Sequence, residues 1–168
     1  TLLPGAARPA VARDPGDAGY ASPLCVAVSP DGQTLYITEN TGNGLAVARP
    51  GQPGPDRVIP VSGAPAGVAV SPDGSSLYVA QSKDKTVTVL NAATYQEKAR
   101  IDVGLRPWGM TLSSDGSTLY VCNQFSHDVS IVDTATAQEI GRVPVIREPS
   151  FCALSEPTST LVVANRFV

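Results

Sequence analysis

The amino-acid sequence predicts an all-β fold, and three observations indicate it. Four prolines open four copies of one repeat, each 42 residues after the one before: Pro23, Pro65, Pro107 and Pro149. After each proline, apolar residues alternate with small ones at the period of two that a pleated strand requires. In the first three copies, a turn sequence of the Ser-Pro-Asp-Gly type then leads into a second alternating segment. A repeat of about 40 to 45 residues filled with strands is typical of a β-propeller, in which each repeat forms one four-stranded antiparallel blade.

The second copy, residues 64–105, shows the expected elements in order. Its turn at residues 71–74 joins two strands, because proline pre-sets the first corner and Gly74 supplies a positive φ at the exit. Two further strands complete the blade. The apolar pairs that mark the four strands are Val68 and Val70, Leu77 and Val79, Val87 and Val89, and Ile101 and Val103. The third copy matches position by position, so Gly116 is also expected at positive φ.

The expected blades are residues 22–63, 64–105 and 106–147, followed by a partial blade at 148–168. In the first blade, a segment rich in proline and glycine replaces the short outer turn of the second. The last blade stops after two strands, and Glu156 begins a segment that replaces its Asp-Gly turn. The sequence therefore predicts about three and a half blades, which is a partial or open propeller.

Residues 1–21 precede the repeats and are rich in proline and glycine, so we expect an N-terminal arm there. Residues 10–12 could add a closing strand to the last blade. Three and a half blades cannot close a ring, because each blade packs against two neighbours. The chain also begins without methionine. We expect it to be a fragment of a longer propeller, or to have its open flanks covered by a second chain.

The second strand of each repeat carries a tetrapeptide that resembles the Tyr-Val-Thr-Asn signature of the YVTN family of β-propeller repeats. The four versions are residues 36–39 (Tyr-Ile-Thr-Glu), 78–81 (Tyr-Val-Ala-Gln), 120–123 (Tyr-Val-Cys-Asn) and 162–165 (Val-Val-Ala-Asn). The turn before each tetrapeptide and the Asp-Thr-Ala-Thr segment at 133–136 are also similar to that family. The resemblance implies an exported bacterial or archaeal protein, periplasmic or extracellular, with no shared catalytic residue.

Composition and motifs narrow the range of possible functions. With 42% hydrophobic residues, 15 glycines and 15 prolines, the chain is globular and rich in turns. A net charge of −3 and the absence of a basic stripe argue against nucleic acid as a partner. No apolar run reaches the roughly 18 residues of a membrane span. Nucleophile elbows, phosphate loops and metalloprotease motifs are missing from the sequence. We expect no catalytic residue and no cofactor.

The single histidine and the three cysteines do not form a metal or haem motif. His127 has no second ligand at metal spacing, so we expect a loop histidine and no metal site. Cys25, Cys122 and Cys152 lack the Cys-x-x-Cys spacing, and we expect all three thiols to be unbridged. The alternative is a Cys122–Cys152 bridge, because neighbouring blades stack their inner strands.

The candidate binding site lies where the copies differ. In a propeller, the loops before the first strands and the loops between the second and third strands share one side of the ring, which we call the funnel face. Arg106 and Trp108 stand where the preceding copy has Ala64 and Ala66. An aromatic ring beside guanidinium groups is typical of a recognition patch. The full candidate set is Arg106, Trp108, Asn123, Phe125, His127, Arg147, Glu148, Asn165 and Arg166. The alternative is that Trp108 packs as scaffold and that Arg106 pairs with Glu148.

Three functions remain open. The first is a non-catalytic propeller scaffold whose funnel face binds a protein or a small ligand. The second is the propeller part of a redox protein with a c-type cytochrome domain outside this chain, because residues 147–149 and 162–166 resemble repeats of such propellers. The third is a hydrolase similar to seven-bladed lactonases, although this chain shows no cluster of acids or of histidine and arginine for it. In each case the remaining blades come from the same parent chain or from a second one.

Overall fold

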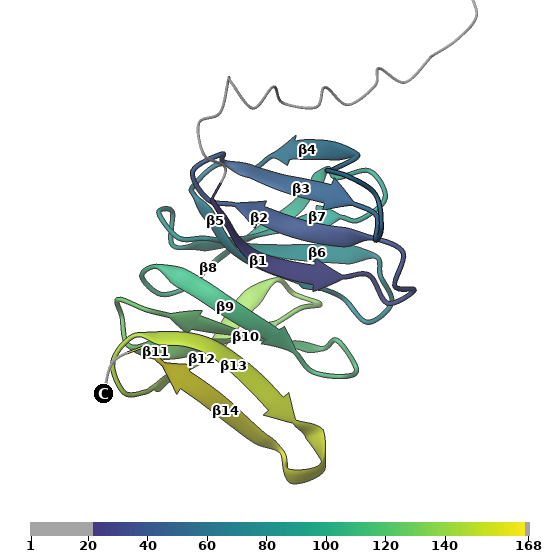
Figure 1. The fold of residues 1–168 in the computed structure, drawn as a ribbon. Helices are drawn as coiled ribbons and strands as arrows, with labels where there is room; N and C mark the ends of the chain where they lie inside the picture. Colours follow the sequence, from purple (N-terminus) through teal and green to yellow (C-terminus); the bar gives the residue numbers. More distant parts are fainter. Residues whose placement is uncertain (1–21, 167–168) are drawn as a thin grey trace, which may run out of the picture.

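The computed structural model describes residues 22–166, which form three four-stranded antiparallel sheets and one two-stranded sheet (Figure 1). The predicted fold is confirmed. The expected arm at residues 1–21 and the proposed closing strand at 10–12 lie outside the described residues. Each sheet follows the order of its strands in the sequence, so each blade is a simple meander.

The strands begin and end close to the alternating segments of the sequence. The first blade contains β1 (Pro23–Val28), β2 (Leu35–Glu39), β3 (Gly44–Ala48) and β4 (Arg57–Pro60). The second contains β5 (Pro65–Val70), β6 (Ser76–Gln81), β7 (Thr86–Asn91) and β8 (Glu97–Asp102). The third contains β9 (Pro107–Leu112), β10 (Thr118–Asn123), β11 (Asp128–Asp133) and β12 (Gln138–Pro144). The partial blade contains β13 (Pro149–Ser155) and β14 (Thr160–Asn165), joined by the short 3₁₀ helix η1 (Glu156–Thr158).

The turns between first and second strands are built as the sequence predicts. Gly32, Gly74 and Gly116 have φ values of 72°, 71° and 73°, a region that glycine enters without steric penalty. In the partial blade the Asp-Gly pair is missing. There η1 replaces the turn, and Ser159 takes the left-handed conformation with φ 48°.

The hydrophobic core lies between the blades, because both faces of a blade sheet are apolar. Leu45 of β3, Leu77 and Val79 of β6 belong to the cluster between the first and second blades. Leu119 and Val121 of β10 belong to the cluster between the second and third. All five side chains are fully buried. Burying a side chain of this size stabilises the fold by roughly 1.5 to 3 kcal/mol.

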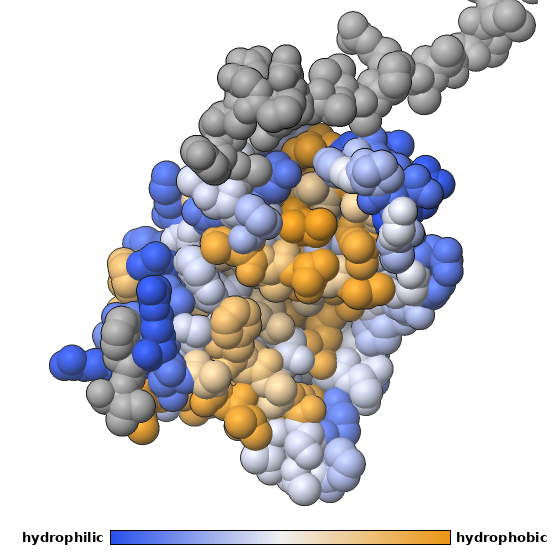
Figure 2. Space-filling model, viewed as in Figure 1, coloured by the Kyte–Doolittle hydropathy of each residue, from blue (hydrophilic) through white to orange (hydrophobic). Residues whose placement is uncertain are grey.

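The two ends of the blade array carry uncovered apolar side chains. Val26 and Val28 of β1 are 57% and 52% exposed, and Phe151 of β13 and Val162 of β14 are 51% and 60% exposed. Figure 2 shows hydrophobic residues gathered over β1 and its neighbours and continuing toward β13. No helix among residues 22–166 is long and apolar enough to cross a membrane.

Candidate functional site

The funnel face is held together by one hydrogen bond that recurs in every repeat. The residue that begins the loop after the second strand donates its amide to the carbonyl of the residue before the repeat proline. The four bonds join Asn40 to Ser22, Ser82 to Ala64, Gln124 to Arg106, and Arg166 to Glu148, at 3.0 to 3.2 Å. The two loop sets therefore share one face, and their side chains are presented by a rigid backbone.

The position before each repeat proline has an unusual backbone. Ser22, Ala64, Arg106 and Glu148 have φ values of 46°, 54°, 55° and 49°, all in the left-handed region that non-glycine residues rarely enter. Because this conformation recurs at the repeat period, it belongs to the scaffold. The four side chains, by contrast, are chemically unrelated.

Arg106 is the centre of the candidate site. Its guanidinium carbon lies 5.2 Å from the ring centre of Trp108 and 4.5 Å from that of Phe125. Both distances are within the range of a cation–π interaction. The three residues come from the loop before β9, from β9 itself and from the loop after β10. They are far from identical in exposure, since Phe125 is 54% exposed while Arg106 and Trp108 are half-buried.

A pocket of about 380 Å³ opens beside this cluster, between the second and third blades. Ala64 of the second blade lines it and leaves room that a larger side chain would fill. The lining consists of three cations (Lys83, Lys85 and Arg106), three large apolar residues (Leu105, Trp108 and Phe125), and Asn40, Ala64 and Ser82. The pocket thus joins apolar walls to a positively charged rim.

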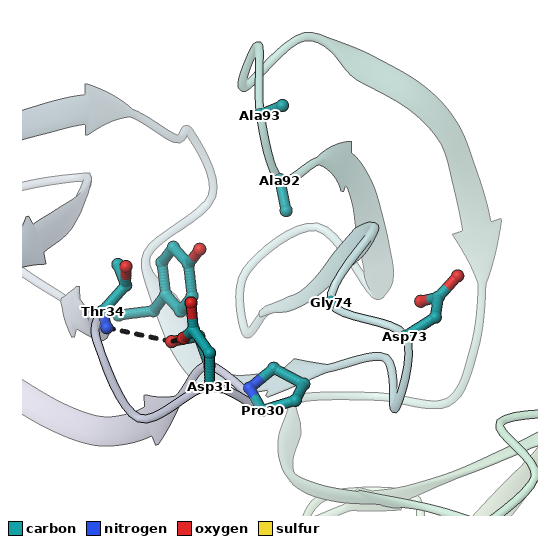
Figure 3. A pocket seen from close by; sticks show the side chains of 9 residues that line it. Pro30, Asp31, Thr34, Asp73, Gly74, Ala92 and Ala93 are labelled. Atoms are coloured by element: carbon teal, nitrogen blue, oxygen red, sulfur yellow. Dashed lines mark hydrogen bonds between the residues drawn. The ribbon is translucent and has the colours of Figure 1, made fainter.

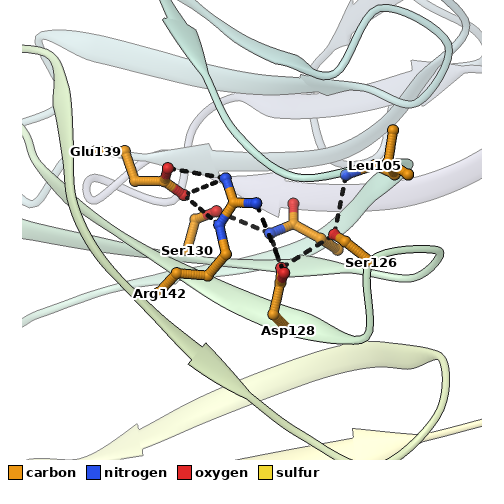
Figure 4. Close-up of polar contacts among 7 residues, drawn as sticks. Leu105, Ser126, Asp128, Ser130, Glu139 and Arg142 are labelled. Atoms are coloured by element: carbon orange, nitrogen blue, oxygen red, sulfur yellow. Dashed lines mark hydrogen bonds and ion pairs between the residues drawn. The ribbon is translucent and has the colours of Figure 1, made fainter.

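A buried polar network supports the loop that carries Arg106 (Figure 4). The amide of Leu105 donates to the Ser126 hydroxyl at 3.0 Å, and that hydroxyl donates to Asp128 at 3.1 Å. The Asn123 side chain donates to Asp128 at 2.7 Å and to Ser130 at 2.8 Å. Asn123 is fully buried, and its side chain belongs to this network and does not line the pocket.

The network is closed at its outer end by Arg142 of β12. Its guanidinium lies 3.6 Å from Asp128 and forms a 2.8 Å ion pair with Glu139. The carboxylate of Asp128 thus contacts Asn123, Ser126 and Arg142, and these contacts hold the two ends of the loop from 123 to 128 together.

The other candidate residues gather at the next blade boundary. His127 has φ 55°, and its Nδ1 accepts a hydrogen bond from the amide of Glu148 at 3.2 Å. Arg147, which precedes Glu148 in the chain, is exposed. Asn165 and Arg166 lie at the end of β14, and the Asn165 side-chain oxygen is buried without a hydrogen-bond partner. These residues therefore lie between the third blade and the partial blade.

The alternative ion pair between Arg106 and Glu148 is absent from the described residues. The structure instead places Arg106 against two aromatic rings. It also adds Lys83, Lys85 and Leu105 to the pocket. The sequence signal for Lys83 was its position, since Ser82 and Lys83 stand one repeat before Gln124 and Phe125.

A second pocket of about 310 Å³ lies on the opposite face, among the turns (Figure 3). Asp31 and Asp73 line it, but each carboxylate is occupied within its own turn. Asp31 accepts bonds from the Ser29 hydroxyl and the Gln33 amide, and Asp73 from the Ser71 hydroxyl and the Ser75 amide. These bonds lower the pKa of Asp73 to about 2. The carboxylates stabilise turns and offer little to a ligand.

All three cysteines are free, as predicted. Cys152 lies between the partial blade and the third blade, where its thiol donates to the carbonyl of Tyr120 at 3.8 Å. A hydrogen bond with Cys152, together with burial, raises the pKa of the Cys122 thiol. Within residues 22–166, no three His, Cys, Asp or Glu side chains come together in a way that could hold a metal ion.

Repeated meander blades with their core between the sheets define the chain as a β-propeller, of which three complete blades and part of a fourth are described. The chain belongs to the YNCE-like β-propeller family, which matches residues 57–167. No curated protein matches the sequence.

Solved structures place the same fold in larger proteins. Hydrazine synthase of Kuenenia stuttgartiensis is 27% identical with a TM-score of 0.82, over 90% of this chain and 44% of its own. A protein of unknown function from Desulfotomaculum acetoxidans is 20% identical with a TM-score of 0.73, over 88% of this chain and 50% of its own. A putative 6-phosphogluconolactonase from Bacteroides uniformis is 20% identical with a TM-score of 0.71, over 86% of this chain and 47% of its own. The chain therefore spans about half the length of the structures that it matches.

Proposed function

We propose that this chain is part of a non-catalytic β-propeller that binds a protein or a small ligand on its funnel face. The observation that carries the proposal is the cluster of Arg106, Trp108 and Phe125 beside an open pocket. The preceding repeat forms the same backbone with Ala64 and Ala66, so the fold does not need an arginine or a tryptophan at these positions. Aromatic and arginine side chains dominate the binding energy of many interfaces.

The wider setting is part of the same proposal. The YVTN-like tetrapeptides support an exported protein, periplasmic or extracellular. The uncovered flanks at β1 and β14 support further blades, supplied by the same parent chain or by a second chain.

Photo-crosslinking in living cells tests the proposal. A photoreactive amino acid replaces Phe125 on the funnel face or, as a matched control, Ile140 on β12, which is 65% exposed. We expect a discrete adduct from position 125 and none from position 140. The double change Arg106→Ala with Trp108→Ala should abolish the adduct while the purified variant keeps its melting temperature. Equal labelling at positions 125 and 140 would contradict the proposal. A large fall in melting temperature would instead show that Trp108 is part of the scaffold.

A second candidate is a propeller that serves a larger redox protein with a c-type haem domain outside this chain. The 27% identity to part of hydrazine synthase supports a place within a larger enzyme. Purification of the parent protein and its visible spectrum after reduction in pyridine test this candidate. A haem absorption band supports it, and its absence rejects it.

A further inference from the structure

The guanidinium of Arg106 has hydrogen-bonding capacity that the fold does not use. Its two contacts are with the faces of Trp108 and Phe125, and it donates no hydrogen bond to any residue in 22–166. Stacking on a ring holds a guanidinium by its face and leaves the N–H groups at its edge available. Arg106 thus presents a fixed fork of donors at the mouth of the pocket. A fork of this kind matches the two oxygens of a carboxylate.

The charge around the pocket fits the same ligand. Lys83, Lys85 and Arg106 line it, and none of its nine described lining residues carries a carboxylate. Asp84 stands between the two lysines in the sequence, but its carboxylate lies against Gly63, and Asp84 does not line the pocket. The pocket is therefore positive in a protein whose net charge is −3.

The apolar walls of the pocket indicate that the ligand has apolar groups beside its negative charge. Leu105 and Phe125 are 41% and 54% exposed at the pocket rim, and Trp108 lies beside them. These side chains would bury apolar groups on either side of a bound carboxylate. A long polyanion is disfavoured by the net negative charge of the chain. We propose that the pocket binds an acidic peptide segment, with Arg106 on a Glu or Asp carboxylate and Leu105 and Phe125 on flanking apolar side chains. This inference rests on the proposed function of the funnel face.

The repeats explain why one blade boundary has this property. At the boundary of the second and third blades the residues before the repeat prolines are Ala64 and Arg106. At the following boundary they are Arg106 and Glu148. Ala64 leaves space and Arg106 supplies charge, whereas Glu148 would bring a carboxylate to the equivalent place. The acidic-peptide pocket is therefore specific to the boundary between the second and third blades.

Trp108 is the only tryptophan in the chain, so its fluorescence reports on this pocket directly. The probe is the peptide Ala-Leu-Glu-Leu-Ala with blocked ends, titrated into the 168-residue chain, and the matched probe carries Gln in place of Glu. We expect a saturable change in Trp108 emission with the Glu peptide. The Gln peptide should bind about 30-fold more weakly, the equivalent of roughly 2 kcal/mol for an arginine anchor.

Three variants locate the effect. Arg106→Gln should lower the affinity for the Glu peptide to the affinity that the parent chain has for the Gln peptide. Ala64→Glu should do the same while Arg106 is still present, because it places a competing carboxylate in the pocket. Arg57→Gln is the control, since Arg57 also stacks on an aromatic ring, that of Tyr95 at 5.4 Å, but outside this pocket. It should bind like the parent. Melting curves of all three show whether each is folded.

Each other outcome overturns the inference in a distinct way. Equal affinity for the Glu and Gln peptides would reject the carboxylate and leave the proposed function standing. A stronger response to oligothymidine than to the Glu peptide would assign the pocket to nucleic acid. No response to any probe would reject the acidic peptide, whereas the crosslinking at position 125 decides the proposed function separately.

Discussion

Asp73 illustrates how one side chain organises a repeated turn. Its carboxylate accepts hydrogen bonds from the Ser71 hydroxyl and from the amide of Ser75 at 3.0 Å. Asp115 makes the equivalent bonds with Ser113 and Ser117. These bonds favour the ionised carboxylate and lower the pKa of both aspartates from 3.8 to about 2.

Acid should therefore weaken the fold through these turns. Because the pKa is lower in the folded state than in the unfolded chain, the stabilisation is fully present above about pH 4 and is lost as the pH falls toward 2. We expect the melting temperature to fall across this window. Asp73→Asn should make the fall shallower, since the variant has no charge to lose at that turn. Asp102→Asn, at the exposed end of β8 and outside these turns, is the matched control for removing one carboxylate. Parallel curves for the parent and Asp73→Asn would contradict the role given to this carboxylate.

At the scale of the strand, the inner strands β5, β9 and β13 approach one another so closely that two positions require glycine. A Cβ added to Gly67 of β5 would overlap the carbonyl oxygen of Trp108, and one added to Gly109 of β9 would overlap that of Ser150. These atoms belong to the backbone of the next blade, so they cannot move aside without shifting a strand. Gly67 sets the distance between the second and third blades beside the pocket, and Gly109 sets the distance between the third blade and the partial blade.

Gly109→Ala should therefore destabilise the chain by about 2 kcal/mol or more, as overpacking does in a tight interior. Gly141→Ala on β12 is the matched control, because its added Cβ would have no neighbour nearer than 3.8 Å. The control should melt like the parent or slightly above it. Urea unfolding followed by circular dichroism measures both. Equal midpoints for the two variants would show that the blades can move apart at β9.

The strands were predictable because their signals are local and repeated. Pro65, Gly74 and the valines of β5 specify the same hairpin each time that the repeat occurs, and the structure has these strands where the alternation begins and ends. The arrangement of the candidate site residues was predictable only in part. Arg106, Trp108 and Phe125 lie together, but Asn123 is buried because its amide bonds to Asp128 and Ser130.

The burial of Asn123 and the lining of the pocket depend on contacts across a loop or between blades. The repeat pattern of the sequence does not predict those contacts. Lys85 shows the same limit, because it lines the pocket beside Arg106, whereas its φ of 58° recurs at the repeat period in Asn43 and His127. Its place in the pocket cannot be read from its sequence neighbours alone.

At the scale of the whole molecule, the described blades form an open array whose two ends resemble the interior. Cys25 and Ala27 of β1 pack toward the second blade, while Val26 and Val28 point the other way and are uncovered. In a closed ring such a face would be buried against a further blade. Uncovered faces of this kind favour association.

The isolated chain should accordingly self-associate as its concentration rises, as measured by sedimentation velocity. Val26→Lys with Phe151→Lys should reduce this association without lowering the melting temperature, because both side chains are exposed in the single chain. Ile140→Lys, also exposed but on the outer strand β12, should leave association unchanged. A parent chain that stays monomeric at every concentration would contradict this prediction.

The left-handed backbone before each repeat proline has a consequence for how such a protein can change. Ser22, Ala64, Arg106 and Glu148 occupy this conformation with a small, a smaller, a cationic and an anionic side chain. The scaffold therefore imposes the left-handed conformation, whichever side chain stands at the position. A single point mutation at any of these positions can alter the chemistry of the funnel face while the hairpins stay as they are. The four positions are equivalent sites for substitution, and a new binding specificity can evolve at one of them without a change of fold.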